Sequence, residues 1–161
     1  MRRGSATRPG ASQSGYTLVA LLVVVFVMAL GLSVAGPTWR EQNRRLRERE
    51  LMRIGMLYAR AVAEFRASSP GSLKAYPRSL DELVLDPRFL GVRRHLRRLY
   101  PDPIDPAQPW GLTKDADGNI TGVYSQSADA PVAGGPVDLG DLVLAPAQHY
   151  SDWKFSLPTP R

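Results

Sequence analysis

The side chains best suited to metal chemistry stand in one short polar stretch. Asp115, Asp117 and Asn119 alternate along the chain, as the first ligands of a calcium loop do. The glycine that should follow the third ligand and the acidic residue that closes such a loop are both missing. Gly118 stands instead where a hairpin turn places glycine, so we expect a turn over 114–119, with a calcium site there as the alternative.

The rest of the sequence offers little for catalysis. His95 and His149 are the only histidines; His95 stands among arginines, and neither belongs to a recognisable metal-ligand spacing. A serine-nucleophile motif, a phosphate-binding glycine loop and a catalytic carboxylate pair are all missing from the sequence. Cysteine is absent, which excludes a disulfide framework and a thiolate metal site. The sequence therefore predicts a protein that is not an enzyme and has no resident cofactor.

The positive charge is concentrated in three places. The 161 residues carry a net charge of +6, and 14 prolines and 14 glycines accompany a mean hydropathy of -0.22. Arginines precede an apolar run at positions 2, 3 and 8, follow it over 40–53, and recur in "RRHLRR" at 93–98. The low mean hydropathy therefore averages a strongly apolar segment with a polar chain long enough for one small domain.

The third cluster has the spacing of a charged helix face. "FLGVRRHLRRLYPDPI", 89–104, predicts a short basic helix closed by Pro101 and Pro103. Its face would consist of four arginines, Arg93, Arg94, Arg97 and Arg98. These could meet phosphates or acidic partners, but only His95 supplies a ring for base stacking. We expect a solvated or subunit-contacting face and no nucleic acid, with nucleic-acid uptake as the alternative.

The long apolar run predicts a membrane helix. No residue from Pro9 through Trp39 is charged, and Leu18–Ala35 is nearly all Leu, Val, Ala, Phe and Met. A helix needs roughly 20 apolar residues to cross the hydrocarbon core, so we expect a transmembrane helix over 16–37. The alternative is a secretion signal, because "SVAG" at 33–36 imitates a small-residue cleavage site.

Helical periodicity continues beyond Pro37, over 38–68, and "SSPGS" ends it near Ser68. One apolar stripe recurs at spacings of three and four residues, comprising Leu51, Ile54, Tyr58, Ala61 and Phe65. The other faces carry Arg and Glu, including the spaced pairs Glu41 with Arg45 and Glu50 with Arg53. We expect the stripe to pack on the following domain.

The remaining chain predicts short helices and a small antiparallel sheet. Ser79 and Glu82 form a capping-box pattern before a short helix. Strand patterns cover 110–113 and 120–125, and "ADAPVAGGPVD", 128–138, has the composition of a loop. A last strand is expected in "HYSDWKFSL", 149–157, with Trp153 and Phe155 on one face. The fold class is therefore α+β, with a long N-terminal helix before a small head.

The start of the apolar run carries a more specific pattern. A basic leader is followed by "GYTL" and then "ALLVVV", which resembles the N-terminus of type IV pilins and type II secretion pseudopilins. Further along, "YPRSLDEL" and "RRLYPDP" resemble the soluble domain of pseudopilins. The resemblance implies a pilin-like subunit of a secretion or pilus-related filament that supports protein secretion.

The resemblance also assigns roles to individual residues. Prepilin peptidase would cut after Gly15, remove the leader 1–15 and methylate Tyr16, and Pro37 would kink the helix. The chain would cross the inner membrane once, with a cytoplasmic N-terminus and a periplasmic head over 69–161. Its partners would be other pilins or pseudopilins, the peptidase, the inner-membrane assembly platform and lipid. The family's calcium loop would fall near Asp129, in a stretch short of acids.

Ala20 departs from the family pattern. The pattern usually has Glu at the fifth residue after the cut, where it pairs with the amino terminus of a neighbouring subunit. Alanine cannot make this pair, which favours a minor or specialised subunit over the bulk repeating one. The alternative interpretation is an unprocessed single-pass membrane protein whose periplasmic head is a binding or scaffolding module.

Overall fold

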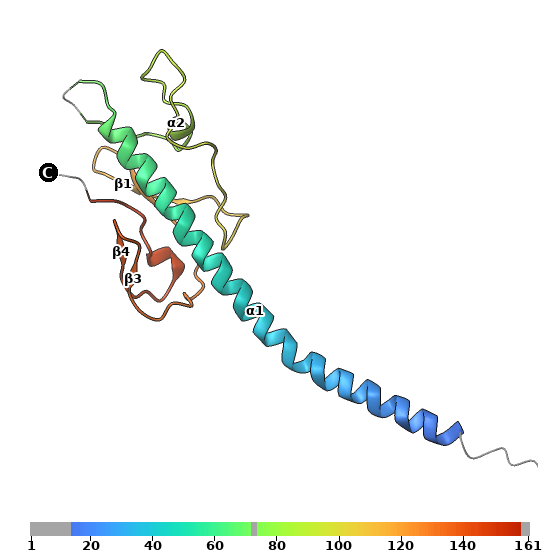
Figure 1. Ribbon diagram of the computed structural model, residues 1–161. Helices are drawn as coiled ribbons and strands as arrows, with labels where there is room; N and C mark the ends of the chain where they lie inside the picture. Colours follow the sequence, from blue (N-terminus) through green and yellow to red (C-terminus); the bar gives the residue numbers. More distant parts are fainter. Residues whose placement is uncertain (1–13, 72–73, 159–161) are drawn as a thin grey trace, which may run out of the picture. The chain divides into compact units, whose positions relative to one another are not determined.

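The computed structural model describes residues 14–71 and 74–158; the side chains of 14–15 and 32–38 also lie outside the described part. The chain divides into two compact units, residues 1–42 and 43–161. Helix α1, Ser14–Ala67, contributes its first half to one unit and its second half to the other (Figure 1). The two units are considered separately.

The first unit contains the apolar half of α1. All side chains described between residues 16 and 31 are exposed. Over the part of the chain that the structure describes, no helix is both long and apolar enough to cross a membrane. Residues 1–13 of the leader 1–15 are outside the described residues, as are the side chains over 32–38, so the predicted kink at Pro37 stays a prediction.

The second unit is built around the other half of α1. The predicted stripe is confirmed: Leu51 and Tyr58 are fully buried, and Ile54, Ala61 and Phe65 are nearly so. They form one core with aromatic residues from the rest of the unit, namely Trp110, Tyr150, Trp153 and Phe155. The helix ends at Ala67, next to the predicted Ser68, and Lys74 Nζ donates a 3.0 Å hydrogen bond to the Ala67 carbonyl oxygen.

Two small antiparallel sheets complete the α+β fold. Strands β1, Gly111–Lys114, and β2, Ile120–Tyr124, pair as predicted, with an irregularity between Thr113 and Lys114. Gly118 has a φ of +83° in the connecting turn, a backbone conformation that favours glycine. Strands β3, Val137–Asp138, and β4, Val143–Leu144, form a second sheet that the sequence did not indicate. Each has only two residues, too few for a hydrophobic alternation.

The predicted capping box at Ser79 is wrong. The short helix α2, Asp81–Val84, has Leu80 at its N-cap, with no side-chain hydrogen bond there. Glu82 reaches back as expected, but its Oε2 accepts the backbone N–H of Arg78 at 3.0 Å. The helix therefore begins one residue later than the motif predicts. The Glu82 carboxylate satisfies one backbone N–H group of the turn before the helix, and no side chain caps the helix itself.

The predicted helix over 89–104 is also wrong, because this segment is an irregular loop. Its backbone donors bond to distant carbonyls: the N–H groups of His95 and Leu96 both donate to Leu83 O, at 2.8 Å each. Asp86 N in turn donates to Arg93 O at 3.0 Å. These bonds use backbone groups that a helix would need internally, so the arginines of 93–98 form no helix face.

The last predicted strand, over 149–157, is reduced to one isolated bridge at Phe155, and the rest of this segment is not a strand. Residues Tyr150–Asp152 form a short 3-10 helix, η1, where the strand was expected to begin. The carboxylate of Asp152 accepts the backbone N–H of His149 at 3.0 Å, which turns the chain back on itself. Phe155 then bridges to Val123 of β2, and Trp153 and Phe155, which were predicted to share one face, are both buried.

Candidate functional site

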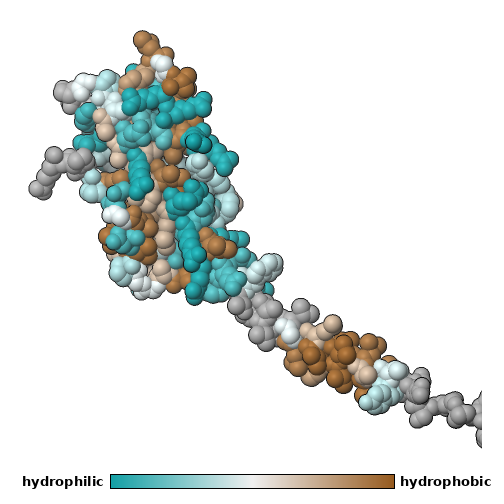
Figure 2. Space-filling view, in the orientation of Figure 1, coloured by the Kyte–Doolittle hydropathy of each residue, from teal (hydrophilic) through white to brown (hydrophobic). Residues whose placement is uncertain are grey.

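The most unusual surface is the apolar half of α1. Its large apolar side chains are each 52 to 66 % exposed, at Leu18, Val19, Leu21, Leu22, Val23, Val24, Val25, Phe26, Val27, Met28 and Leu30. They occupy all sides of the helix, which appears as an apolar stretch in Figure 2. A helix that is apolar all round is typical of a buried environment, and the described residues leave this surface uncovered.

The predicted processing residues lie at the beginning of this surface. Helix α1 starts at Ser14, so the Gly15–Tyr16 peptide bond falls in its first turn. Tyr16 is 81 % exposed. Ala20 lies one turn further along the same side of the helix and is also exposed, because residues four apart are neighbours on a helix surface. A glutamate at position 20 would therefore face the residue-16 end, and alanine offers only a methyl group.

A buried carboxylate of the second unit, Glu48, bonds the second half of α1 to the rest of that unit. Glu48 is 5 % exposed and accepts three hydrogen bonds: from Val132 N at 2.6 Å, Ala133 N at 3.0 Å and Tyr150 Oη at 2.8 Å. Burial, and then the bond to Glu48, raise the pKa of the Tyr150 hydroxyl. The sequence interpretation missed this contact, although Glu48 precedes Leu51 by three residues and so continues the apolar stripe.

A second polar cluster fixes the loop after α2 to the end of α1. Asp86 is buried and accepts from Arg88 Nε at 2.8 Å and Arg88 Nη2 at 2.6 Å, and its Oδ2 lies 3.1 Å from His95 Nε2. The Arg88 guanidinium, more than the other partners, holds the pKa of Asp86 well below its usual range. Arg88 also donates to Phe65 O at 2.8 Å. His95 therefore contributes to packing: the centroid of its ring lies 5.5 Å from that of Phe65.

The expected turn over 114–119 is present, and the residues of the alternative calcium site lie in it. Asp115 Oδ1 accepts the backbone N–H groups of Asp117 at 3.0 Å and Asn119 at 2.9 Å, and Oδ2 accepts Asn119 Nδ2 at 3.1 Å. These bonds, the Asn119 side chain first, lower the pKa of Asp115. Asp129 is exposed, and its backbone carbonyl accepts from Tyr150 N at 3.0 Å. Within the described ranges, no three acidic or histidine side chains gather as a metal-binding group.

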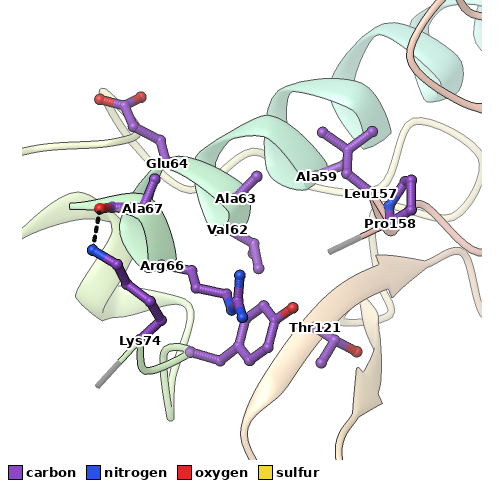
Figure 3. Close-up of a pocket in the computed structure, with 11 residues that line it drawn as sticks. Ala59, Val62, Ala63, Glu64, Arg66, Ala67, Lys74, Thr121, Leu157 and Pro158 are labelled. Carbon is purple, nitrogen blue, oxygen red and sulfur yellow. Dashed lines mark hydrogen bonds between the residues drawn. The ribbon is translucent and has the colours of Figure 1, made fainter. Parts of the chain in front are cut away.

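A pocket of about 610 Å³ lies beside the C-terminal turns of α1 (Figure 3). Its apolar walls include Val62, Ala63 and Leu157, and Thr121 of β2 forms part of its edge. The two cationic side chains of the pocket already have contacts: Lys74 bonds to the helix end, and Arg66 lies 5.2 Å from the Tyr76 ring centroid. The lining therefore combines apolar walls with two cationic side chains that already contact other groups.

The described structure thus places Tyr16 and Ala20 on one exposed apolar helix, while the Gly15 and Pro37 side chains are outside the described residues. The sequence interpretation missed two buried carboxylates of the second unit, Glu48 and Asp86, and each accepts several hydrogen bonds there. Compared with protein-family models, with curated proteins and with solved structures, the chain has no match.

Proposed function

We propose that the chain is a pseudopilin-like subunit of a type II secretion or type IV pilus-related filament that supports protein secretion. The observation that carries the proposal is the apolar helix surface over 16–31, exposed on all sides. Such a surface is stable when lipid or similar helices surround it. In this proposal 16–37 anchors the chain in the inner membrane, the N-terminus faces the cytoplasm, and the head 69–161 lies in the periplasm.

The proposed work of the helix is mechanical. An apolar helix that dissolves in lipid also packs against copies of itself, so transfer from membrane to filament exchanges one apolar environment for another. The head packs on α1 residues from Leu51 onward to form one core, and this core contains no residue of the apolar half of α1. The assembly platform could therefore move the subunit with its head folded.

Ala20 narrows the role within a filament. Without a carboxylate at this position, the helix enters the bilayer without the cost of a buried charge. It also lacks the group that would pair with the amino terminus of a neighbouring subunit. Both properties favour a specialised or initiating subunit over the bulk repeating one.

Processing by prepilin peptidase gives the direct test. We expect coexpression of the full chain with the peptidase to yield a mature protein that begins at methylated Tyr16, measured by intact mass and N-terminal sequencing. Gly15→Ala should block or slow the cut, because a side chain is added beside the bond that the peptidase must approach. Gly31→Ala is the matched control, since a Cβ at this position of the same helix meets nothing within 4 Å.

Three outcomes would contradict the proposal. An uncut chain would favour the single-pass scaffolding protein, and a start near Gly36 would favour a secretion signal. Normal processing of the Gly15→Ala variant would show that the peptidase does not recognise Gly15.

A further inference from the structure

The loop that follows α2 presents an exposed surface that is separate from the apolar half of α1. We call residues 89–94 the basic apolar tip. Leu90 and Val92 are 112 % and 76 % exposed, the two most exposed large apolar side chains described in the second unit. Gly91 between them has no atom within 4 Å of the position of a Cβ. The tip therefore projects its apolar side chains into solvent.

Cationic side chains stand directly beside these apolar ones. Arg93 and Arg94 belong to the tip, and Arg97 and Arg98 follow; all four residues are exposed. No acidic residue occurs between Asp86 and Asp102, and both of these carboxylates are buried, each in a residue 1 % exposed. Figure 2 shows the apolar cap above hydrophilic residues at this end of the molecule, where Figure 1 places the loop next to α2. The surface is thus both apolar and positively charged.

Hydrogen bonds at the base of the loop fix the conformation of the tip. Asp86 binds Arg88 and His95 on the two sides of the loop, and the backbone bond from Asp86 N to Arg93 O closes it. The Phe89 ring lies 4.6 Å from the Arg93 guanidinium carbon and 5.9 Å from that of Arg88. A loop closed at its base loses less conformational entropy when its end binds a partner.

We propose that the basic apolar tip binds the surface of an anionic lipid bilayer. Leu90 and Val92 would enter the boundary between headgroups and acyl chains, and Arg93 and Arg94 would meet the lipid phosphates. A bilayer matches both properties because it offers an apolar layer directly beneath a negative one. An acidic protein would match the charge alone unless it also had a pocket for Leu90, and the tip offers too few rings to stack nucleic-acid bases.

The test requires that the apolar half of α1 is already covered. The full chain is held in nanodiscs of zwitterionic lipid and mixed with separate vesicles of phosphatidylcholine, with or without phosphatidylglycerol. Co-flotation with the vesicles then measures the tip, and processing at Gly15 plays no part in it. Leu90→Ser with Val92→Ser removes the apolar end, and Arg93→Gln with Arg94→Gln removes the charge. Val143→Ser is the matched control, because Val143 is an equally apolar residue of β4 and is 61 % exposed.

We expect binding to the anionic vesicles only. It should fall about tenfold for each double variant and should be weak at high salt, because both apolar insertion and charge contribute. A Leu90→Trp variant should lose fluorescence against brominated anionic lipid, and Val143→Trp should not. The proposal would be overturned by an absence of binding to anionic vesicles, which is expected if the partner is a protein. Equal binding to anionic and neutral vesicles would overturn it as well. Equal losses in the Val143→Ser control would also overturn the proposal.

Discussion

Glu48 and Glu50 show how position on a helix decides what a residue does. Both belong to the same arginine-rich stretch of α1, two residues apart. Glu48 continues the buried stripe and accepts three hydrogen bonds from the head, whereas Glu50 faces solvent and pairs with Arg53 at 2.6 Å. The first carboxylate is a structural contact, and the second is a surface ion pair.

Glu48→Gln should therefore destabilise the head by about 2 kcal/mol, because the amide replaces one charged acceptor oxygen with a donor that faces other donors. The measurement is urea unfolding of the full chain in mild detergent, followed by near-ultraviolet circular dichroism. The matched control Glu50→Gln should change the free energy of unfolding by no more than about 0.5 kcal/mol, as exposed ion pairs contribute little. Equal effects of the two substitutions would contradict the structural role of Glu48.

At the scale of elements, the second half of α1 is shaped to receive one aromatic ring. A Cβ at Gly55 would lie 2.4 Å from Phe155 Cγ, far inside van der Waals contact. Phe155 is fully buried and bridges to β2. The missing side chain of Gly55 thus lets the C-terminal segment pack directly against the helix backbone.

We expect Gly55→Ala to lower the free energy of unfolding of the head by about 1–2 kcal/mol, despite the better helix propensity of alanine. Thermal unfolding followed by tryptophan fluorescence would measure the loss. Gly31→Ala, at an open position of the same helix, should not lower the melting temperature. A stabilised Gly55→Ala variant would mean that Phe155 does not pack on Gly55.

The elements differ in how much of them the sequence predicts. The stripe from Leu51 to Phe65 and the hairpin around Gly118 follow local rules of periodicity and turn chemistry, and both predictions are confirmed. The helix predicted over 89–104 is wrong because its backbone donors bond to Leu83, a partner that no local pattern reveals. The same reason explains why Glu48, whose partners lie 84 to 102 residues away, was not singled out.

At the scale of the whole molecule, the chain divides its apolar residues between two uses. Those from Leu51 onward form the core of the second unit. Those described between residues 16 and 31 are exposed and form no core. For the candidate site, the sequence alone predicts the processing residues and the apolar surface. It does not predict the basic apolar tip, because the tip depends on the loop that replaced a predicted helix.

This division predicts that one charge in the apolar half should release the protein from membranes. Val24→Asp places a carboxylate in the middle of the run, at a cost of about 3 kcal/mol if the helix is in lipid. Fractionation with carbonate extraction should show a loss of roughly tenfold or more in the membrane pellet. Val143→Asp, in the head, should leave the pellet unchanged. A wild-type chain that is itself washed out would contradict the proposed anchor.

The way the head is bonded to α1 has a mechanical consequence. Its contacts with the helix are distributed from Arg44 to Ala67, over the part of α1 that belongs to the second unit. A force directed along this part of the helix would load the contacts in shear and would distribute the tension among them. A motor that pulled on the N-terminal end of the helix would carry the folded head as its cargo.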